Sequence, residues 1–379
     1  MNVEKIREDF PVLKKKAIYF DNACMTLRPK QVVDKVVEYY NEYPACAGRS
    51  IHSFGNKVND EVNSARKLVK DFIGAKKESE IIFTKNTTES INLLANSFNG
   101  ERVLLTDREH NSNLIPWQRF KQGILRSNLD FTFNLERFSE IVKNYELISF
   151  VATSNLDGYT LPIKEIIKIA HENNVKVHLD GAQFVPHNEI NVKKLDLDYL
   201  SFSGHKMLGP TGTGVFYAKE ELLKGMKQFI IGGETVINST YNDFVMEKSP
   251  HKFEGGLQNY AGIIGLGAAV KYLSKIGLSE IKDHEIRLRR AVDVSGLKLI
   301  GKNSGGIVNF NVPGVNFHEV ATILDTSDNI MIRSGQHCMH SWFNANNIEG
   351  SARASFYLYN SMDEIKVLNE ALNKLKKLG

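Results

Sequence analysis

The chain has 379 residues, 42% of them apolar and 24% charged, an ordinary globular composition in a length that favours two domains over one small core. The net charge is only +4 and is spread along the chain, which disfavours nucleic-acid binding. The first ten residues mix charges throughout, so we expect no signal peptide, and the longest apolar runs are far short of a membrane span. Three scattered cysteines, an odd number, argue against a disulfide framework and for a reducing compartment, which predicts a cytoplasmic protein.

Short apolar runs alternate with segments of helical spacing between about residues 60 and 220. The predicted strands cover residues 81–84, 102–106, 147–152, 175–180, 198–203 and 214–218, and the predicted helices cover 60–73, 87–97 and 163–172. This alternation predicts an α/β fold with a mainly parallel sheet and helices on both of its faces. Ligands of such sheets bind at the carboxyl ends of the strands, so candidate residues are sought there.

The pattern changes after residue 259. Predicted helices cover 260–274, 279–292 and 362–378, and short strands are predicted near 306–312 and 330–333. We interpret this as a smaller α+β domain at residues 261–379, joined by residues 1–15, beside a large domain at 16–260.

A lysine follows one of the predicted buried strands and precedes a glycine-rich turn, in the segment 201–214 (SFSGHKMLGPTGTG). Burial at a strand end lowers the pKa of a lysine and makes its neutral amine available for Schiff-base chemistry. Lys206 is therefore a candidate for a cofactor-binding lysine, and Ser203 and His205 could both reach a phosphate beside it. A surface loop with a solvated lysine explains the segment about equally well when it is taken alone.

An acidic residue ends the preceding strand. The run 175–183 (VKVHLDGAQ) places Asp180 at the carboxyl edge of the sheet and Gln183 just after it. Pyridoxal 5′-phosphate (PLP) needs an acid facing its pyridine nitrogen, because the protonated ring is the electron sink for a carbanion. Asp180 and Lys206 together favour a PLP site, in which Gln183 could donate to the ring hydroxyl. A helix cap is the alternative for Asp180, but it leaves Lys206 unexplained.

Three further segments carry supporting candidates. The run 81–89 (IIFTKNTTE) predicts a strand, a turn and a helix N-terminus at which Thr87 and Thr88 could bind a phosphate, although a plain N-cap explains them too. His110 follows the next strand and could stack on a cofactor ring, although a lone histidine is usually structural. Asn155 could hydrogen-bond the cofactor or the substrate, or form an ordinary Asx turn.

In this order, the motifs resemble those of the class V aminotransferase family of fold-type I PLP enzymes. The matching segments are 19–23 (YFDNA), 87–89 (TTE), 180–183 (DGAQ), 203–206 (SGHK) and 352–356 (ARASF), which span nearly the whole chain. The resemblance implies the fold-type I architecture, PLP carried by Lys206 and a homodimer.

One loop discriminates between activities in this family. The segment 333–338 (RSGQHC) resembles the loop of the SufS-like, group II cysteine desulfurases and selenocysteine lyases, whose cysteine attacks the sulfur of a PLP-bound cysteine. Only a thiolate does this well, so we expect Arg333 and His337 to be the cations that stabilise the thiolate of Cys338. A small unreactive cysteine, or a zinc site made by His337, Cys338 and His340, is the alternative.

The resemblance also implies roles for the remaining candidates. Arg353 would clamp the substrate carboxylate, for which guanidinium geometry is suited, with Arg333 and Asn155 as further substrate ligands. His52 matches a histidine near the site and the dimer partner. His110 is grouped with Lys206, the general base, and Cys338 as a catalytic candidate.

The implied reaction converts L-cysteine to L-alanine and holds the sulfur as a persulfide on Cys338. An acceptor or scaffold protein would then receive the sulfur for iron–sulfur cluster or other sulfur-cofactor assembly. L-selenocysteine as substrate, another class V activity such as transamination, and a non-enzymatic scaffold are the alternatives. No metal is expected.

The sequence departs from the family pattern at four positions. Leu257 stands where the family often has a threonine that reaches the phosphate of the neighbouring subunit's cofactor, and Asn111 stands where a second histidine is common. No proline follows Cys338 and Met339, so we expect a more mobile loop or one suited to a different acceptor. Cys24 occupies a position that usually holds a small residue, and we expect a small buried side chain there rather than a second thiol.

Overall fold

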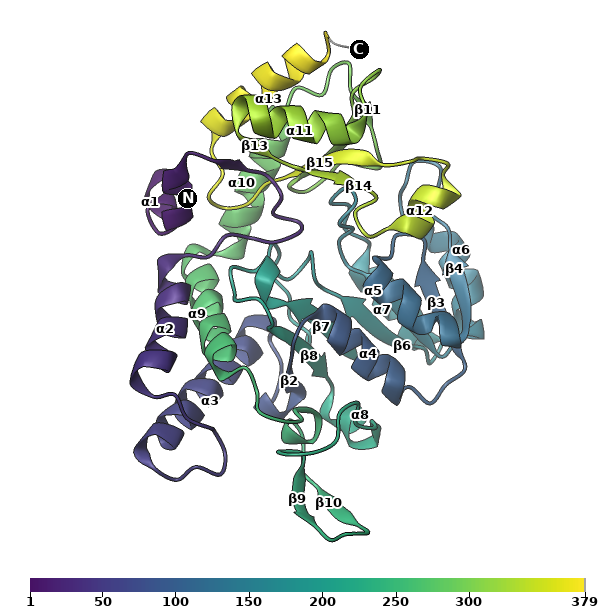
Figure 1. Cartoon of the computed structure of the whole chain (residues 1–379). Helices are drawn as coiled ribbons and strands as arrows, with labels where there is room; N and C mark the ends of the chain where they lie inside the picture. Colours follow the sequence, from purple (N-terminus) through teal and green to yellow (C-terminus); the bar gives the residue numbers. More distant parts are fainter. Residues whose placement is uncertain (378–379) are drawn as a thin grey trace.

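A central seven-stranded sheet organises the computed structural model, which describes residues 1–377 (Figure 1). Its strand order is β2-β8-β7-β6-β5-β3-β4. The strands are β2 (Ile81–Thr84), β3 (Arg102–Thr106), β4 (Lys121–Leu125), β5 (Leu147–Val151), β6 (Lys176–Asp180), β7 (Tyr199–Ser203) and β8 (Gly214–Ala218). Only β8 runs antiparallel to its neighbours, so the predicted mainly parallel sheet is confirmed.

Helices cover both faces of this sheet. One face packs against α2 (Lys30–Glu42), α3 (Ser53–Ile73), α6 (Leu135–Ile141), α7 (Ile163–Glu172) and α9 (Tyr260–Ile276), and the other against α4 (Thr87–Ser97), α5 (Asn111–Leu114) and α8 (Glu220–Gly225). Successive side chains of a strand point to opposite faces. Ile81 and Phe83 accordingly belong to one core and Ile82 to the other. Burial on both sides explains why the sequence shows continuous apolar runs.

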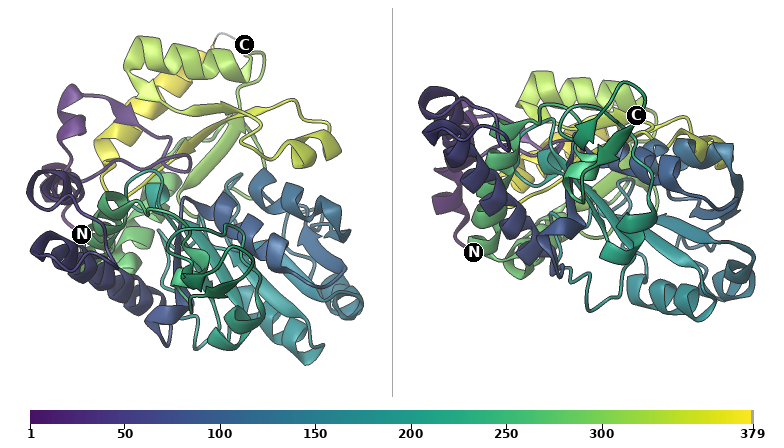
Figure 2. Two further views of the ribbon diagram at one scale, coloured as in Figure 1. Left: turned by 60° about the horizontal axis from the view of Figure 1, so that its bottom comes forward. Right: turned by 90° about the horizontal axis from the view of Figure 1, so that it is seen from below.

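A second, antiparallel sheet lies toward the C-terminus, in the order β11-β12-β15-β14. Its strands are β11 (Lys298–Leu299), β12 (Ile307–Asn311), β14 (Arg333–Gly335) and β15 (Ser351–Ser355). Figures 1 and 2 show α11 (Phe317–Asp328) and α13 (Met362–Leu375) on the side of this sheet that faces away from the central sheet. Leu378, predicted as the end of the last helix, lies outside the described residues.

The strand predicted near residues 330–333 is divided between two partners. β13 (Ile330–Met331) pairs in parallel with β1 (Ile18–Tyr19), whereas β14 pairs with β15. The N-terminal helix α1 (Val3–Arg7) also contacts the C-terminal part of the chain, because Arg7 donates to the Tyr359 carbonyl at 2.7 Å and to Glu364 at 2.8 Å.

The helix α9 packs in the core of the central sheet and leads into α10 (Leu278–Ala291). The domain boundary at residue 260 stays a prediction. In residues 1–377 no single helix is long and apolar enough to cross a membrane, and α9 and α10 meet that test only jointly, across a bend of 76°. The remaining elements are α12 (His340–Ala345) and a hairpin of β9 (Val236–Ser239) and β10 (Phe244–Met246), which projects from the molecule at the bottom of Figure 1.

Candidate active site

A cavity of about 240 Å³ lies at the carboxyl ends of β5, β6 and β7, whose last residues Val151, Asp180 and Ser203 line it. Nearly all the site residues predicted from the sequence line this cavity. These are Thr87, Thr88, His110, Asn155, Asp180, Gln183, Ser203, His205, Lys206, Arg333, Cys338 and Arg353. Segments far apart in the sequence therefore meet where a parallel sheet is expected to bind its ligand.

A lysine and an acid stand at the ends of two adjacent strands. Lys206 closes a short 3₁₀ turn (Gly204–Lys206) directly after β7, and Asp180 is the last residue of β6. Asp180 is 2% exposed and accepts from the Ala182 amide at 2.9 Å. Burial raises the pKa of Asp180, opposed by that hydrogen bond and by Lys206, and burial lowers the pKa of Lys206, opposed by Asp180. Lys206 is thus shifted toward the neutral amine that Schiff-base chemistry needs.

The N-terminus of α4 meets the end of β7. The Thr87 amide donates to Ser203 Oγ at 2.8 Å, and the two hydroxyls are 2.7 Å apart. Thr88 Oγ1 lies 2.8 Å from Ser112 Oγ. Hydroxyls and free amides at a helix N-terminus form an anion site, which fits the predicted phosphate position. Burial, with Lys206 and Arg28 nearby, lowers the pKa of His205 to about 4, so its ring is neutral near pH 7.

His110 also presents a neutral ring to the cavity. Its Nδ1 accepts from the Ser112 amide at 3.0 Å, which places the proton of the neutral ring on Nε2. Burial is the main reason that its pKa falls to about 3, and the charges of Lys206 and Arg353 add to the effect. Such a ring suits stacking on a cofactor.

A buried arginine provides the anion-binding end of the cavity. Arg353 is 2% exposed and donates through Nη1 to the Asn155 carbonyl at 2.7 Å and through Nη2 to Asp21 at 3.3 Å. Among residues 1–377, its Nε and the side-chain oxygen of Asn155 have no hydrogen-bond partner. Buried polar groups without partners are costly unless a ligand satisfies them. A carboxylate would satisfy this guanidinium.

Hydrogen bonds hold the Cys338 loop, between β14 and α12, over the cavity. Asn155 Nδ2 donates to the His337 carbonyl at 2.8 Å, and the Asn111 amide donates to the Cys338 carbonyl at 2.8 Å. The Asn111 side chain lies 2.8 Å from His340 Nδ1. His337 and Cys338 both adopt left-handed backbone angles, with φ of 50° and 59°. Asn111, noted only as a departure from the family, is therefore an anchor of this loop; the greater mobility expected for the loop stays a prediction.

The structure differs from the expectation that His337 and Arg333 are the cations beside Cys338. His337 is 4% exposed, and burial, with Arg353 and Arg333 nearby, lowers its pKa well below the usual range. The prediction that His337 is a cation is therefore wrong. Arg333 Nη1 lies 2.8 Å from the sulfur of Cys24 rather than serving Cys338. Cys24, expected to be simply buried, is half-buried and lines the cavity.

His52 is the one predicted site residue that lies outside this cavity in the described structure. Its Nδ1 accepts from the Gly55 amide at 3.3 Å, so it caps the N-terminus of α3. The predicted helix began only at residue 60, and the true start at Ser53 explains why the cap was missed. A role at a dimer partner stays a prediction.

Several residues of the site were missed by sequence reasoning. Asn86 and Ser112 line the cavity, and Asp21 holds Arg353. Asn86 carried a usable signal, because an asparagine before Thr-Thr-Glu is a strong N-cap, and its side chain accepts from the Glu89 amide at 3.0 Å. In the described part of the chain, no group of three or more His, Cys, Asp or Glu residues could hold a metal ion.

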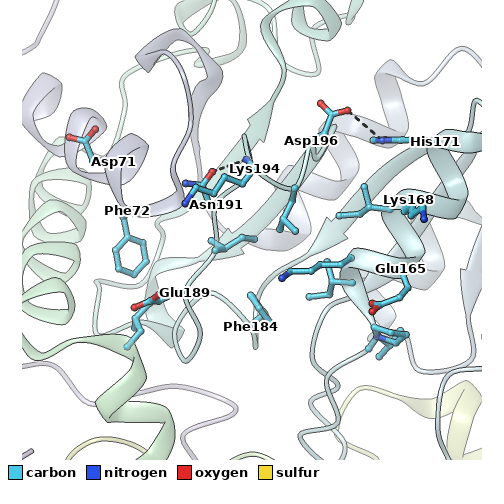
Figure 3. A pocket seen from close by; sticks show the side chains of 18 of the residues that line it. Asp71, Phe72, Glu165, Lys168, His171, Phe184, Glu189, Asn191, Lys194 and Asp196 are labelled. Atoms are coloured by element: carbon cyan, nitrogen blue, oxygen red, sulfur yellow. Dashed lines mark hydrogen bonds and ion pairs between the residues drawn. The ribbon is translucent and has the colours of Figure 1, made fainter.

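A larger cavity, of about 1200 Å³, lies between α7 and the segment 184–196 (Figure 3). Its labelled side chains carry both signs of charge, with His171 Nδ1 3.6 Å from Asp196. None of the described residues that line it is a predicted site residue. The chemistry therefore belongs to the smaller cavity.

A mainly parallel sheet with a lysine and a buried acid on adjacent strand ends defines an α/β enzyme that holds a cofactor at its sheet edge. Residues 18–368 match the family Aminotransferase class-V, and the chain belongs to this family.

Its relatives include proteins named as cysteine desulfurases. A probable cysteine desulfurase of Halalkalibacterium halodurans is 37% identical, over 100% of this chain and 98% of that protein. The structure of a cysteine desulfurase from Thermococcus onnurineus NA1 has a TM-score of 0.95 at 37% identity and covers 100% of this chain and 99% of that one. The cysteine desulfurase CsdA of Escherichia coli has a TM-score of 0.93 at 28% identity, with the same coverage of 100% and 99%.

Proposed function

We propose that the protein is a PLP-dependent cysteine desulfurase in which Cys338 receives the sulfur of L-cysteine as a persulfide. The observation that carries this proposal is the meeting of Lys206, Asp180, Arg353 and Cys338 in one cavity. A transaminase would need the first three, but it would leave the cysteine loop without a task. The full-length similarity to proteins named as cysteine desulfurases supports the same activity.

The residues present fit PLP. Asp180 is a buried acid suited to the pyridine nitrogen, Lys206 supplies the amine, and His110 supplies a neutral ring for stacking. The hydroxyls of Thr87, at the start of α4, and of Ser203, at the end of β7, suit the phosphate. Gln183 donates one amide proton to the Ala23 carbonyl at 2.6 Å and retains a second for the ring hydroxyl. When bound, PLP supplies the electron sink for cleavage next to the amino-acid Cα.

Three side chains of the protein have separate roles in the reaction. Arg353, which lines the cavity, orients the substrate carboxylate through its guanidinium. The neutral Lys206 amine takes the Cα proton. The Cys338 thiolate attacks the substrate sulfur, so that an S–S bond forms as the C–S bond breaks. The electron pair of the C–S bond stays with the three-carbon fragment, which is released as alanine.

A homodimer is part of the proposal. Large apolar side chains are exposed at residues 51–54, around the start of α3, and within residues 230–257, which include the hairpin. Arg49 joins these two segments by donating to the Val236 carbonyl at 2.8 Å. The exposed side chains are Ile51, Phe54, Ile230, Ile231, Phe244, Val245 and Leu257. Exposed apolar patches of this kind mark interaction surfaces. Leu257 is 72% exposed, which suits a contact with a second subunit even though it lacks the hydroxyl that the family often has.

The persulfide would pass to an acceptor or scaffold protein in the cytoplasm. L-selenocysteine remains a candidate substrate, and competition between it and L-cysteine would separate the two activities.

The test is alanine formation from L-cysteine by the purified protein supplied with PLP and a thiol reductant. Wild type should form alanine, and Lys206→Ala should form none because no amine remains to bind the cofactor or move the proton. As a matched control, Lys121→Ala removes an exposed lysine far from the cavity and should keep wild-type activity. Wild type that binds PLP but forms no alanine, with or without candidate acceptor proteins, would overturn the proposal.

A further inference from the structure

Two thiols share the active-site cavity. Cys24 and Cys338 both line it, both are half-buried, and neither is in a disulfide within the described residues. They come from opposite ends of the chain: Cys24 follows β1, and Cys338 follows β14. The third cysteine, Cys46, is exposed and does not line the cavity in the described structure. The desulfurase reaction uses one thiol, so Cys24 has no role in it.

The strand that precedes the Cys338 loop, β14, carries the cation that contacts Cys24. Arg333 lies five residues before Cys338, and its Nη1 is 2.8 Å from Cys24 Sγ. A guanidinium is permanently charged and has only donors, so Arg333 contacts the Cys24 sulfur as a charged hydrogen-bond donor. Cys24 is therefore held in the cavity by a charged side chain from the strand that precedes the Cys338 loop.

Two buried polar side chains of the same cavity point to a ligand there. Arg353 and Asn155 line the cavity with side chains that are 2% and 4% exposed, and the buried Arg353 Nε and Asn155 Oδ1 have no partner among residues 1–377. An amino acid bound there brings its side chain into a space that both sulfurs border. Sulfur that reaches Cys338 is thus released into the cavity that Cys24 also lines.

We propose that Cys24 is a second sulfur-carrying site, which takes the outer sulfur from the Cys338 persulfide. The inference rests on the proposed desulfurase function. The Cys24 thiolate attacks the outer sulfur, a new S–S bond to Cys24 forms, and the S–S bond to Cys338 breaks. The electron pair of the broken bond returns to Cys338 as a thiolate. One persulfide is consumed and one is made, so the step needs no oxidant or reductant.

The transfer has a countable consequence. Because Cys338 is regenerated, it can accept sulfur from a second molecule of L-cysteine while Cys24 still holds the first. Each chain therefore stores two sulfur atoms in the fast first phase of alanine formation, before the thiol of excess L-cysteine slowly removes them.

The first experiment counts alanine formed per chain by the PLP-loaded enzyme with excess L-cysteine and no reductant. Wild type should give a burst of two alanines per chain and Cys24→Ala a burst of one. The matched control Cys46→Ala, which removes the exposed cysteine, should still give two. A burst of one in wild type would overturn the proposal.

The second experiment locates the sulfur and needs no Cys24 variant, so it decides the matter even if Cys24→Ala does not fold. Wild type is treated with ³⁴S-labelled L-cysteine, alkylated and digested, and the persulfide label should appear on the Cys24 and Cys338 peptides. In Cys338→Ala, Cys24 should carry no label. Label on Cys338 alone in wild type, or on Cys24 in Cys338→Ala, would overturn the transfer and leave the desulfurase function standing. Wild type that forms neither alanine nor label would instead overturn the proposed function.

Discussion

Replacing Arg353 by lysine should weaken the use of L-cysteine without abolishing it. The guanidinium donates through Nη1 to the Asn155 carbonyl at 2.7 Å and through Nη2 to Asp21 at 3.3 Å, and its Nε has no partner among residues 1–377. The substrate carboxylate would be its third partner. One lysine amine keeps the charge but cannot make all three contacts. The loss of one charge-assisted hydrogen bond costs about 1.5–3 kcal/mol, which corresponds to a decrease of about tenfold to a hundredfold in kcat/KM.

Initial rates of alanine formation over a range of L-cysteine concentrations measure this effect. The change should appear mainly in KM, because the carboxylate is bound equally in the ground state and the transition state. Arg119→Lys, which alters an exposed arginine away from the cavity, is the control and should match wild type. A folded Arg353→Lys protein with wild-type kcat/KM would show that this arginine does not hold the substrate.

Three further perturbations test the surrounding structure. Glu254→Gln breaks a buried ion pair in which both carboxylate oxygens lie 2.8 Å from Arg66, and urea titration should show a loss of about 3–5 kcal/mol in the free energy of unfolding; a loss below about 1 kcal/mol would contradict this. Burial lowers the pKa of His178 to about 3, so the unfolded chain takes up a proton at this residue below its ordinary value of 6.5 and stability falls as the pH drops from there toward 3. Over this pH range, the free energy of unfolding of His178→Gln should fall by about 1.4 kcal/mol less per pH unit than that of wild type. An equal dependence on pH in the two proteins would refute the assignment. Asn111→Ala removes the side-chain contact of the Cys338 loop, so iodoacetamide should alkylate Cys338 several-fold faster than in wild type, whereas an unchanged rate would show that this contact does not restrain the loop.

The central sheet and most of the site could be predicted because both depend on local sequence patterns. Strands buried on both faces appear as continuous apolar runs, and β2, β3, β8, α4 and α7 begin and end at the predicted residues. Residues at or just past the carboxyl ends of parallel strands, as Asp180 and Lys206 are, must lie at one edge of the sheet. The positions of these residues after their strands were therefore enough to predict the cofactor-binding end of the site.

What the sequence could not provide is burial and pairing between distant segments. Arg333 and Cys24 are 309 residues apart, and nothing local to either indicates that their side chains meet. The sequence predicts a cation at His337 beside a cysteine, but burial, with the charges of Arg353 and Arg333 nearby, lowers the pKa of His337 well below its usual range. The predicted strand at residues 330–333 divides because its two halves pair with different strands, a choice that depends on tertiary packing.

The most direct test of the central claim is to quantify alanine and sulfide together when purified wild type and Cys338→Ala turn over L-cysteine with a thiol reductant. The account predicts equal amounts of both products from wild type and from the exposed-cysteine control Cys46→Ala, and neither product from Cys338→Ala. Full alanine and sulfide production by Cys338→Ala would contradict it and would remove Cys338 from the reaction.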